Sequence, residues 1–266
     1  MARIDVTGLT KTFQAIKGET VEALSDLSFA VGENEFVSIV GPSGCGKSTL
    51  LYIIAGFIAP TKGEVLIDHR TVREPGPDRG IVFQEYALFP WRTVQDNIKY
   101  GLEEKGVPKG EADQIVQKYL RLMGLEGFQH KYPKELSGGM KQRVALARTL
   151  AYDPGVLLMD EPFGALDAQT RELQQDELLA IWREKKKTVL FVTHSVEEAV
   201  YLSEKVVIMT ARPGRIKSIV EIALDRSRSR EDIVTSPEFS RLRNRVWLEV
   251  REEVLKHYAS AREAPR

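Results

Sequence analysis

Residues 36–55, FVSIVGPSGCGKSTLLYIIA, contain the pattern on which the fold depends. The first five residues form a short apolar run that predicts a buried strand, and residues 47–57 predict a helix. Between them, residues 41–49 fit G-x-x-x-x-G-K-[ST], which forms a phosphate-binding loop when a strand precedes it and a helix follows it. The stretch therefore predicts an α/β core built around a site for nucleotide phosphates.

Each residue type in this loop has a role in holding phosphate. Glycine lets the backbone bend closely enough for its N–H groups to face phosphate oxygens, and the following helix adds partial positive charge at its N-terminus. We expect Lys47 to reach the β and γ phosphates as a catalytic residue, and Ser48 to offer its hydroxyl to Mg²⁺. We expect Cys45 to be a small spacer rather than a redox switch. The predicted nucleotide-binding residues of the loop are Gly41, Pro42, Ser43, Gly44, Cys45, Gly46, Lys47, Ser48 and Thr49.

Composition narrows the functional classes. The chain has 266 residues, which at roughly 150 residues per domain suggests one large domain or two small ones. Lys plus Arg and Asp plus Glu each number 38, so no global basic field is available for nucleic acid, and we expect no such partner. A single cysteine excludes an intrachain disulfide and favours a reducing compartment. The longest apolar run, residues 50–59, is too short to span a bilayer.

The order of predicted elements suggests how the core is assembled. Residues 3–9, 23–31 and 64–68 predict N-terminal strands, whereas residues 94–150 change to helical spacing. Continuous apolar strands at 156–159, 189–193 and 206–209, with a helix at 168–185, favour a parallel sheet covered by helices. We expect one domain over residues 1–225, followed by a polar linker and an amphipathic helix over residues 226–266.

An acidic pair ends the strand near residue 160. Asp160 and Glu161 directly follow the apolar run VLLM, at the expected carboxyl end of a parallel strand. Beside a phosphate loop, Asp160 can orient the Mg²⁺ shell and Glu161 can polarise the attacking water. Without such a loop, solvated strand-end charges would be the preferred interpretation.

The segment LSGGMKQR at residues 136–143 resembles the signature sequence of ATP-binding cassette (ABC) proteins, and the resemblance covers roughly residues 3–215. It implies a nucleotide-hydrolysing α/β fold with a phosphate-loop core, a parallel sheet, an N-terminal antiparallel β subdomain and an inserted α-helical subdomain at about 94–150. Taken singly, several of the matching residues have ordinary structural interpretations, and their joint order along the chain makes those interpretations implausible. The resemblance implies that Phe13 stacks on adenine and that Ser137, Gly138 and Gly139 contact the nucleotide. It implies that Gln84 senses Mg²⁺ and water as a catalytic residue, and that His194 contacts the γ-phosphate as a catalytic residue beside Glu161. Asp167 then lies in the D-loop GALD.

The resemblance also implies partners. In the family two copies stack head to tail, and each ATP lies between the phosphate loop of one and the signature of the other, so we expect a dimer with itself or with a similar chain. The aromatic residues within 86–91 are either ordinary core or a groove for a permease helix. We expect the ATPase subunit to lie peripherally on the cytoplasmic face of the membrane, bound to permease subunits and through them to an extracytoplasmic solute-binding protein.

A narrower resemblance points to the importers of nitrate, sulfonates and taurine. It rests on ALFPWRTVQDNI, DEPFGALDAQTR, MTARPGRI and the short tail, with Met140 where the family most often has Gln. Three alternatives stay open at this stage. They are a soluble ABC ATPase acting on ribosomes or nucleic acid, an exporter ATPase subunit, and a catalytically silent regulatory module.

Overall fold

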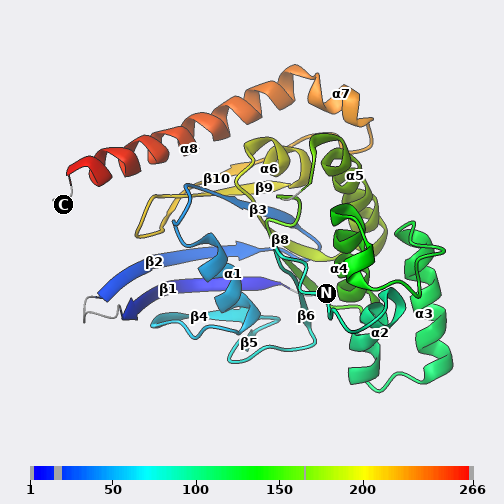
Figure 1. Cartoon of the computed structure of the whole chain (residues 1–266). Helices are drawn as coiled ribbons and strands as arrows, with labels where there is room; N and C mark the ends of the chain where they lie inside the picture. The colour runs from blue at the N-terminus through cyan, green and yellow to red at the C-terminus, as the bar shows by residue number, and fades with distance from the viewer. Residues whose placement is uncertain (1–2, 15–19, 165, 264–266) are drawn as a thin grey trace.

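The computed structural model describes residues 3–14, 20–164 and 166–263, arranged as two sheets with helices around them (Figure 1). The N-terminal sheet is antiparallel, in the order β2-β1-β4-β5. It confirms the antiparallel β subdomain, although its first two strands are longer than the sequence predicts. The strands are β1 (Ile4–Gln14), β2 (Thr20–Val31), β4 (Lys62–Ile67) and β5 (Arg70–Thr71).

The second sheet confirms the parallel core. Its order is β10-β9-β3-β8-β7-β6, with parallel pairing from β9 to β6 and an antiparallel edge strand, β10. All five residues of β3, of β7 and of β8 are buried, as expected for strands covered on both faces. The strands are β3 (Phe36–Val40), β6 (Arg79–Val82), β7 (Val156–Asp160), β8 (Thr188–Val192), β9 (Lys205–Met209) and β10 (Ile216–Glu221).

Two apolar cores lie on opposite faces of this sheet. Successive side chains of a strand point to opposite faces. Accordingly, Val37 and Ile39 of β3 join a core with α1 (Lys47–Ala55) and the antiparallel sheet. Phe36 and Val40 join the other core, formed with the remaining helices. The phosphate-binding loop therefore begins between two packed layers.

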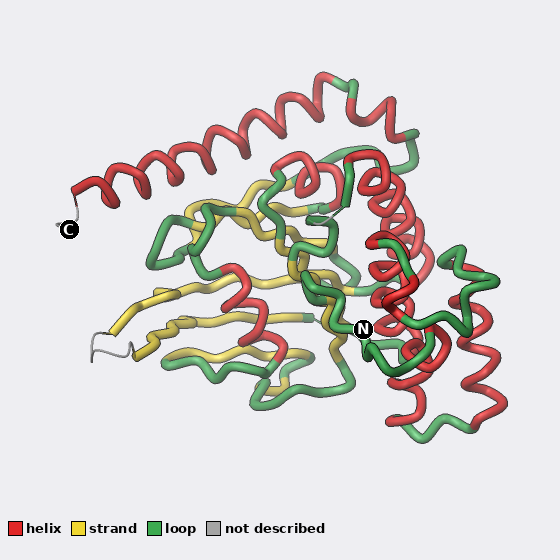
Figure 2. Tube along the Cα trace, viewed as in Figure 1, coloured by secondary structure: helices red, strands yellow, loops and turns green. Residues whose placement is uncertain are grey.

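The insert consists of helices that pack on one another. They are α2 (Val94–Glu104), α3 (Lys109–Leu122), the short 3-10 helix η1 (Pro133–Glu135) and α4 (Gly138–Ala151). The Tyr119 hydroxyl donates to the Leu150 carbonyl at 2.9 Å and joins α3 to α4. Figure 2 shows these helices beside the sheets, on the side where α5 (Ala168–Lys185) also lies.

The tail crosses the cassette rather than extending away from it. After α7 (Arg230–Val234), α8 (Pro237–Glu263) packs on β9 and on α6 (Val196–Leu202), with Val246 fully buried (Figure 1). The Phe239 amide donates to Ser236 Oγ at 3.1 Å, so Ser236 caps the N-terminus of α8. Arg226, at the start of the predicted polar linker, donates to the carbonyls of Val200 and Ser203. Among the described helices, none has the length and apolarity to cross a bilayer.

Candidate functional site: a nucleotide pocket

The phosphate-binding loop is held open by two glycines with positive φ. Gly44 has φ of 74° and Gly46 has φ of 100°, a region that other residues adopt only with strain. A Cβ atom on Gly46 would lie 2.5 Å from a methyl carbon of Leu24, so the loop rests directly on β2. The helix α1 then starts at Lys47, where the Leu50 amide donates to the Gly46 carbonyl at 2.8 Å.

Lys47 lies inside the curve of this loop. Its Nζ donates to the carbonyls of Gly41 at 2.9 Å and Pro42 at 3.0 Å, and only 7% of the residue is exposed. A buried ammonium needs such partners, because an unpaired charge in this environment is costly. Phosphate oxygens are stronger acceptors than carbonyls, so a bound triphosphate can take over these donors.

Asp160 and Ser48 bring the end of β7 to the start of α1. Ser48 Oγ donates to Asp160 Oδ1 at 3.0 Å. Burial raises the pKa of Asp160, and the hydrogen bond from Ser48 opposes that rise. Burial, followed by the negative charge of Asp160, raises the pKa of the neighbouring Tyr52 hydroxyl to about 12.

Glu161 leaves the strand in a different direction. Its φ is 44°, and its amide donates to the Val192 carbonyl on β8 at 2.9 Å. The Glu161 Oε2 atom lies 3.0 Å from Nδ1 of His194, which follows β8 by two residues. The imidazole is 61% exposed and the carboxylate 20%, so the histidine is open to solvent while Glu161 is mostly covered.

A cavity of about 310 Å³ lies against the phosphate-binding loop. Phe13 of β1 and Glu161 both line it, together with residues of the loop. The loop residues that line it are Ser43, Gly44, Gly46, Lys47, Ser48 and Thr49.

Cys45 is the most deeply buried side chain at the tip of the loop that precedes Lys47. Its side chain is 1% exposed and packs into the core beneath the loop, and burial raises the pKa of its thiol. Like Gly41 and Pro42, it does not line the cavity. Cys45 can therefore reach a nucleotide only through its backbone N–H.

Seven other predicted residues do not line this cavity. Two of them, Asp160 and His194, contact the lining residues Ser48 and Glu161, and the other five lie elsewhere. Within the described chain, Gln84 has an exposed side chain without a hydrogen bond, two residues beyond β6. Ser137 caps α4, accepting from the Met140 amide at 3.3 Å. Asp167 caps α5, where the Thr170 amide donates to it at 3.0 Å and holds the pKa of its carboxyl below the usual range. The glycines Gly138 and Gly139 follow Ser137 at the start of α4, and Ala165 of the predicted D-loop lies outside the described residues.

The donor set suits magnesium. Over the described residues there is no cluster of three or more His, Cys, Asp or Glu that could form an all-protein metal cage. Mg²⁺ in nucleotide sites instead takes one or two protein oxygens plus phosphates and water. Ser48 Oγ lines the cavity, and Asp160 Oδ1 lies 3.0 Å from it, so the two side chains supply hard oxygen donors.

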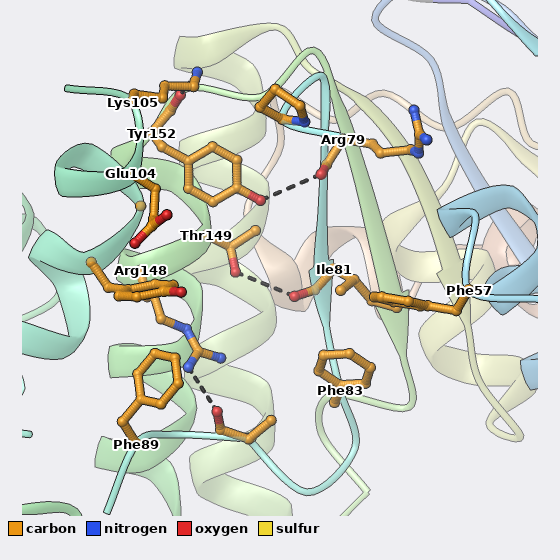
Figure 3. Close-up of a pocket in the computed structure, with 14 residues that line it drawn as sticks. Phe57, Arg79, Ile81, Phe83, Phe89, Glu104, Lys105, Arg148, Thr149 and Tyr152 are labelled. Carbon is orange, nitrogen blue, oxygen red and sulfur yellow. Dashed lines mark hydrogen bonds between the residues drawn. The ribbon is translucent and has the colours of Figure 1, made fainter. Parts of the chain in front are cut away.

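A second hollow, of about 610 Å³, lies between β6 and the helices α2 and α4 (Figure 3). Phe89 lines it, as the groove interpretation of residues 86–91 expects, together with Phe57 and Phe83. Tyr86 packs partly against the core instead, and Trp91 is 73% exposed. Within this segment, Phe89 therefore lines a groove and Tyr86 belongs partly to the core, and binding of a permease helix in the groove stays a prediction. Tyr100 and Tyr152, which also line the groove, carry no sequence signal that separates them from core aromatics.

The phosphate loop, the acidic strand end and the surrounding sheet define a nucleotide-hydrolysing protein of the phosphate-loop class. The family profile described as ABC transporter matches residues 24–164. An ABC transporter ATP-binding protein of Methanocaldococcus jannaschii is 57% identical, over 96% of this chain and 93% of its own length. The nitrate import ATP-binding protein of Synechococcus elongatus is 48% identical, over 88% of this chain and 86% of its own length. This chain belongs to the ABC transporter family and is an ABC ATPase.

A solved structure agrees with this assignment. The dimeric, post-hydrolysis ATP-binding cassette bound to ADP and phosphate superposes with a TM-score of 0.74 at 34% identity. The match covers 84% of this chain and all of that chain. The chain is therefore an ATP-binding subunit of the ABC transporter family, and the reaction that it catalyses is ATP hydrolysis.

Proposed function

We propose that this chain powers the import of a small anion, of the nitrate, sulfonate or taurine kind, through a membrane permease. The observation that carries the transporter part is the aromatic groove beside the Gln84 loop. Relatives named as import ATP-binding proteins for nitrate, taurine and aliphatic sulfonates support the substrate class. No residue of an ATPase subunit need touch the transported solute, so the substrate class rests on relatedness alone.

Each side chain around ATP has a role in this proposal. Phe13 stacks on adenine, and the amides of the phosphate loop and Lys47 bind the phosphates. Ser48, Asp160 and Gln84 would hold Mg²⁺, which neutralises charge on the β and γ phosphates when bound.

Hydrolysis needs an oriented water at the mouth of the pocket. Glu161 accepts a proton from this water while the water oxygen attacks the γ-phosphorus. The bond between the γ-phosphorus and the β–γ bridging oxygen breaks at the same time, and ADP leaves. His194 holds the Glu161 carboxylate through Nδ1 and offers its other ring nitrogen to the γ-phosphate.

A second copy completes the site. Ser137 and Gly138 are exposed at the start of α4 and outside the cavity of their own chain, so they are available to a nucleotide held by another copy. The solved cassette is dimeric, which supports pairing of this chain with a second copy or with a similar chain. ATP closes the pair and loss of the γ-phosphate reopens it, as in a ligand-biased two-state element.

The groove provides the mechanical connection. Arg148 of α4 donates to the carbonyls of Tyr86 and Ala87 at 3.1 Å and 2.7 Å, so the Gln84 loop is bound to the helix that Ser137 caps. A permease helix seated among the aromatic rings would therefore contact both parts. Such binding places the chain on the cytoplasmic face of the membrane, with a solute-binding protein reached through the permease.

Recovery of tagged chain from detergent-solubilised host membranes, with ATP and Mg²⁺, tests this proposal by mass spectrometry. A multi-span permease in near-equal amount is expected. Phe57→Ala, which truncates a half-exposed groove ring, should reduce that recovery about tenfold. Trp247→Ala, at an equally exposed ring on α8, is the matched control and should leave it unchanged. Ribosomal or nucleic-acid-binding partners in place of a permease would overturn the proposal in favour of a soluble ABC ATPase.

A further inference from the structure

The segment 210–215, TARPGR, lies directly against the phosphate-binding loop. Gly214 bridges to β2, because its amide donates to the Ala23 carbonyl and its carbonyl accepts from the Ser25 amide, both at 2.9 Å. A Cβ atom on Gly214 would lie 2.1 Å from the Cys45 carbonyl oxygen. The two backbones therefore touch, and only glycine permits this approach.

Internal hydrogen bonds give this segment one shape. Thr210 Oγ1 donates to the Pro213 carbonyl at 3.0 Å and accepts from the Arg215 amide at 2.9 Å. The Arg215 guanidinium donates to Ser25 Oγ at 3.2 Å. The segment is thus fixed to β2, which itself forms one wall of the nucleotide cavity through Val21 and Ala23.

Arg212 points from this segment toward the cavity. Its Nη2 donates to the Gly44 carbonyl at 3.3 Å, and the side chain lines the cavity together with Phe13, Lys47 and Ser48. Lys47 is the first cation at this cavity, and its ammonium donates to carbonyls of its own loop. Arg212 is a second cation at the same cavity. A guanidinium with five donors can keep its bond to Gly44 and still bind a phosphate oxygen.

The tail helix holds the neighbouring residue. The Ala211 amide donates to Glu253 Oε2 of α8 at 3.3 Å. Glu253 is buried, and Lys217 and Lys256 lie 3.1 Å and 2.9 Å from its Oε1. The position of residue 211, and with it that of Arg212, therefore depends on how α8 is seated.

We propose that Arg212 is a nucleotide-binding residue that contacts the phosphates of ATP, and that Glu253 of the tail helix is its positioning residue. This inference rests on the proposed assignment of the cavity to the nucleotide. It gives the tail a function, since displacement of α8 lowers the affinity of the ATPase for its nucleotide.

Equilibrium binding of a fluorescent ATP analogue to the full chain tests the role of Arg212. Arg212→Ala should weaken binding about fivefold to tenfold and flatten its dependence on salt, because a charge-assisted contact to phosphate is lost. Arg212→Lys should recover part of the affinity. The matched control is Arg241→Ala, at an exposed arginine on α8, which should bind as wild type does. Equal affinities for Arg212→Ala and Arg241→Ala would overturn the proposal.

A double-mutant cycle tests the positioning role of Glu253. Glu253→Ala alone should weaken binding about threefold, yet cause no further loss when Arg212 is already alanine. Additive losses in the double variant would show that Glu253 does not act through Arg212. The urea midpoint of each variant without nucleotide separates this effect from simple destabilisation of α8.

Two further variants separate failure of the inference from failure of the pocket assignment. Lys47→Ala and Phe13→Ala should each weaken binding of the same analogue at least tenfold if the cavity holds ATP. Wild-type binding by both would overturn the pocket and the role of Arg212 together. Weakening by both, with Arg212→Ala unchanged, would contradict the role of Arg212 alone.

Discussion

His194 Nδ1 lies 3.0 Å from Oε2 of Glu161, across the carboxyl ends of the neighbouring strands β8 and β7. The register that pairs Asp160 with Val192 places the two side chains opposite each other, one and two residues beyond that pair. An imidazole in this position fixes the orientation of a carboxylate that would otherwise rotate in solvent. The arrangement therefore matches a proton acceptor held by a second polar group.

This relationship predicts a defect in turnover rather than in binding when the histidine is removed. His194→Ala should lower kcat for ATP hydrolysis about 100-fold, since an oriented proton-transfer group contributes about 10²–10⁴ to rate. KM for ATP should change less than about threefold, because most binding contacts belong to the phosphate loop. Phosphate-release kinetics check both values. His130→Ala, at an exposed histidine, is the control, and an equal kcat in the two variants would refute the role of His194.

Replacement of Arg148 should destabilise the fold, because this residue supports the loop that contains Gln84. It is bound to the Tyr86 and Ala87 carbonyls, and those two residues have φ of 56° and 47°, a strained turn that needs support. Lysine cannot reproduce the forked contact, so Arg148→Lys should lower the free energy of unfolding by about 1–2 kcal/mol. Urea unfolding measures this change against Arg121→Lys, an exposed arginine on α3. A midpoint equal to that of the control would rule out the support role.

The ion pair that joins Glu252 of α8 to Lys217 of β10 should weaken in acid. Hydrogen bonds from Lys217 and Lys256 lower the pKa of Glu252 from 4.5 to about 2. A carboxyl whose pKa is depressed in the folded state stabilises that state above its ordinary pKa, and the contribution is lost as pH falls toward the folded value. Exchange protection of α8 amides, corrected for intrinsic rates, should therefore decline as pH falls from 4.5 to about 2.

Lys217→Met provides the comparison for this effect. Without Lys217, the pKa of Glu252 moves back toward its ordinary value, so the loss of α8 protection should begin at a higher pH. Peptides from β8, which lie far from this ion pair in the core, should follow the same pH course in both proteins. Identical curves of α8 protection against pH for wild type and variant would contradict the role of the ion pair between Lys217 and Glu252.

Most elements of the core could be predicted because their sequence pattern is local. The strands β3, β7 and β8 each contain four apolar residues out of five, and α5 begins after the N-cap Asp167, so their bounds were predictable to within one residue. β6 was not predictable, since Arg79 and Gly80 open it and only four residues pair. Its pairing with β7 is a long-range interaction that no short window of sequence contains.

The site divides in the same way. Lys47, Asp160, Glu161 and His194 belong to motifs whose order along the chain reveals them, although the 3.0 Å contact between Glu161 and His194 depends on strand register. Arg212 could not be predicted as part of the pocket, because 168 positions separate it from Gly44 and only the bridge between Gly214 and β2 brings them together.

The most direct test of the account is the Glu161→Gln variant, measured for ATP binding and phosphate release in the same preparation. The amide keeps the shape of the side chain but cannot accept the proton of the attacking water. We predict ATP affinity equal to that of wild type and phosphate release reduced at least about 100-fold. Phosphate release at the wild-type rate would contradict the assignment of Glu161 and the hydrolytic mechanism built on it.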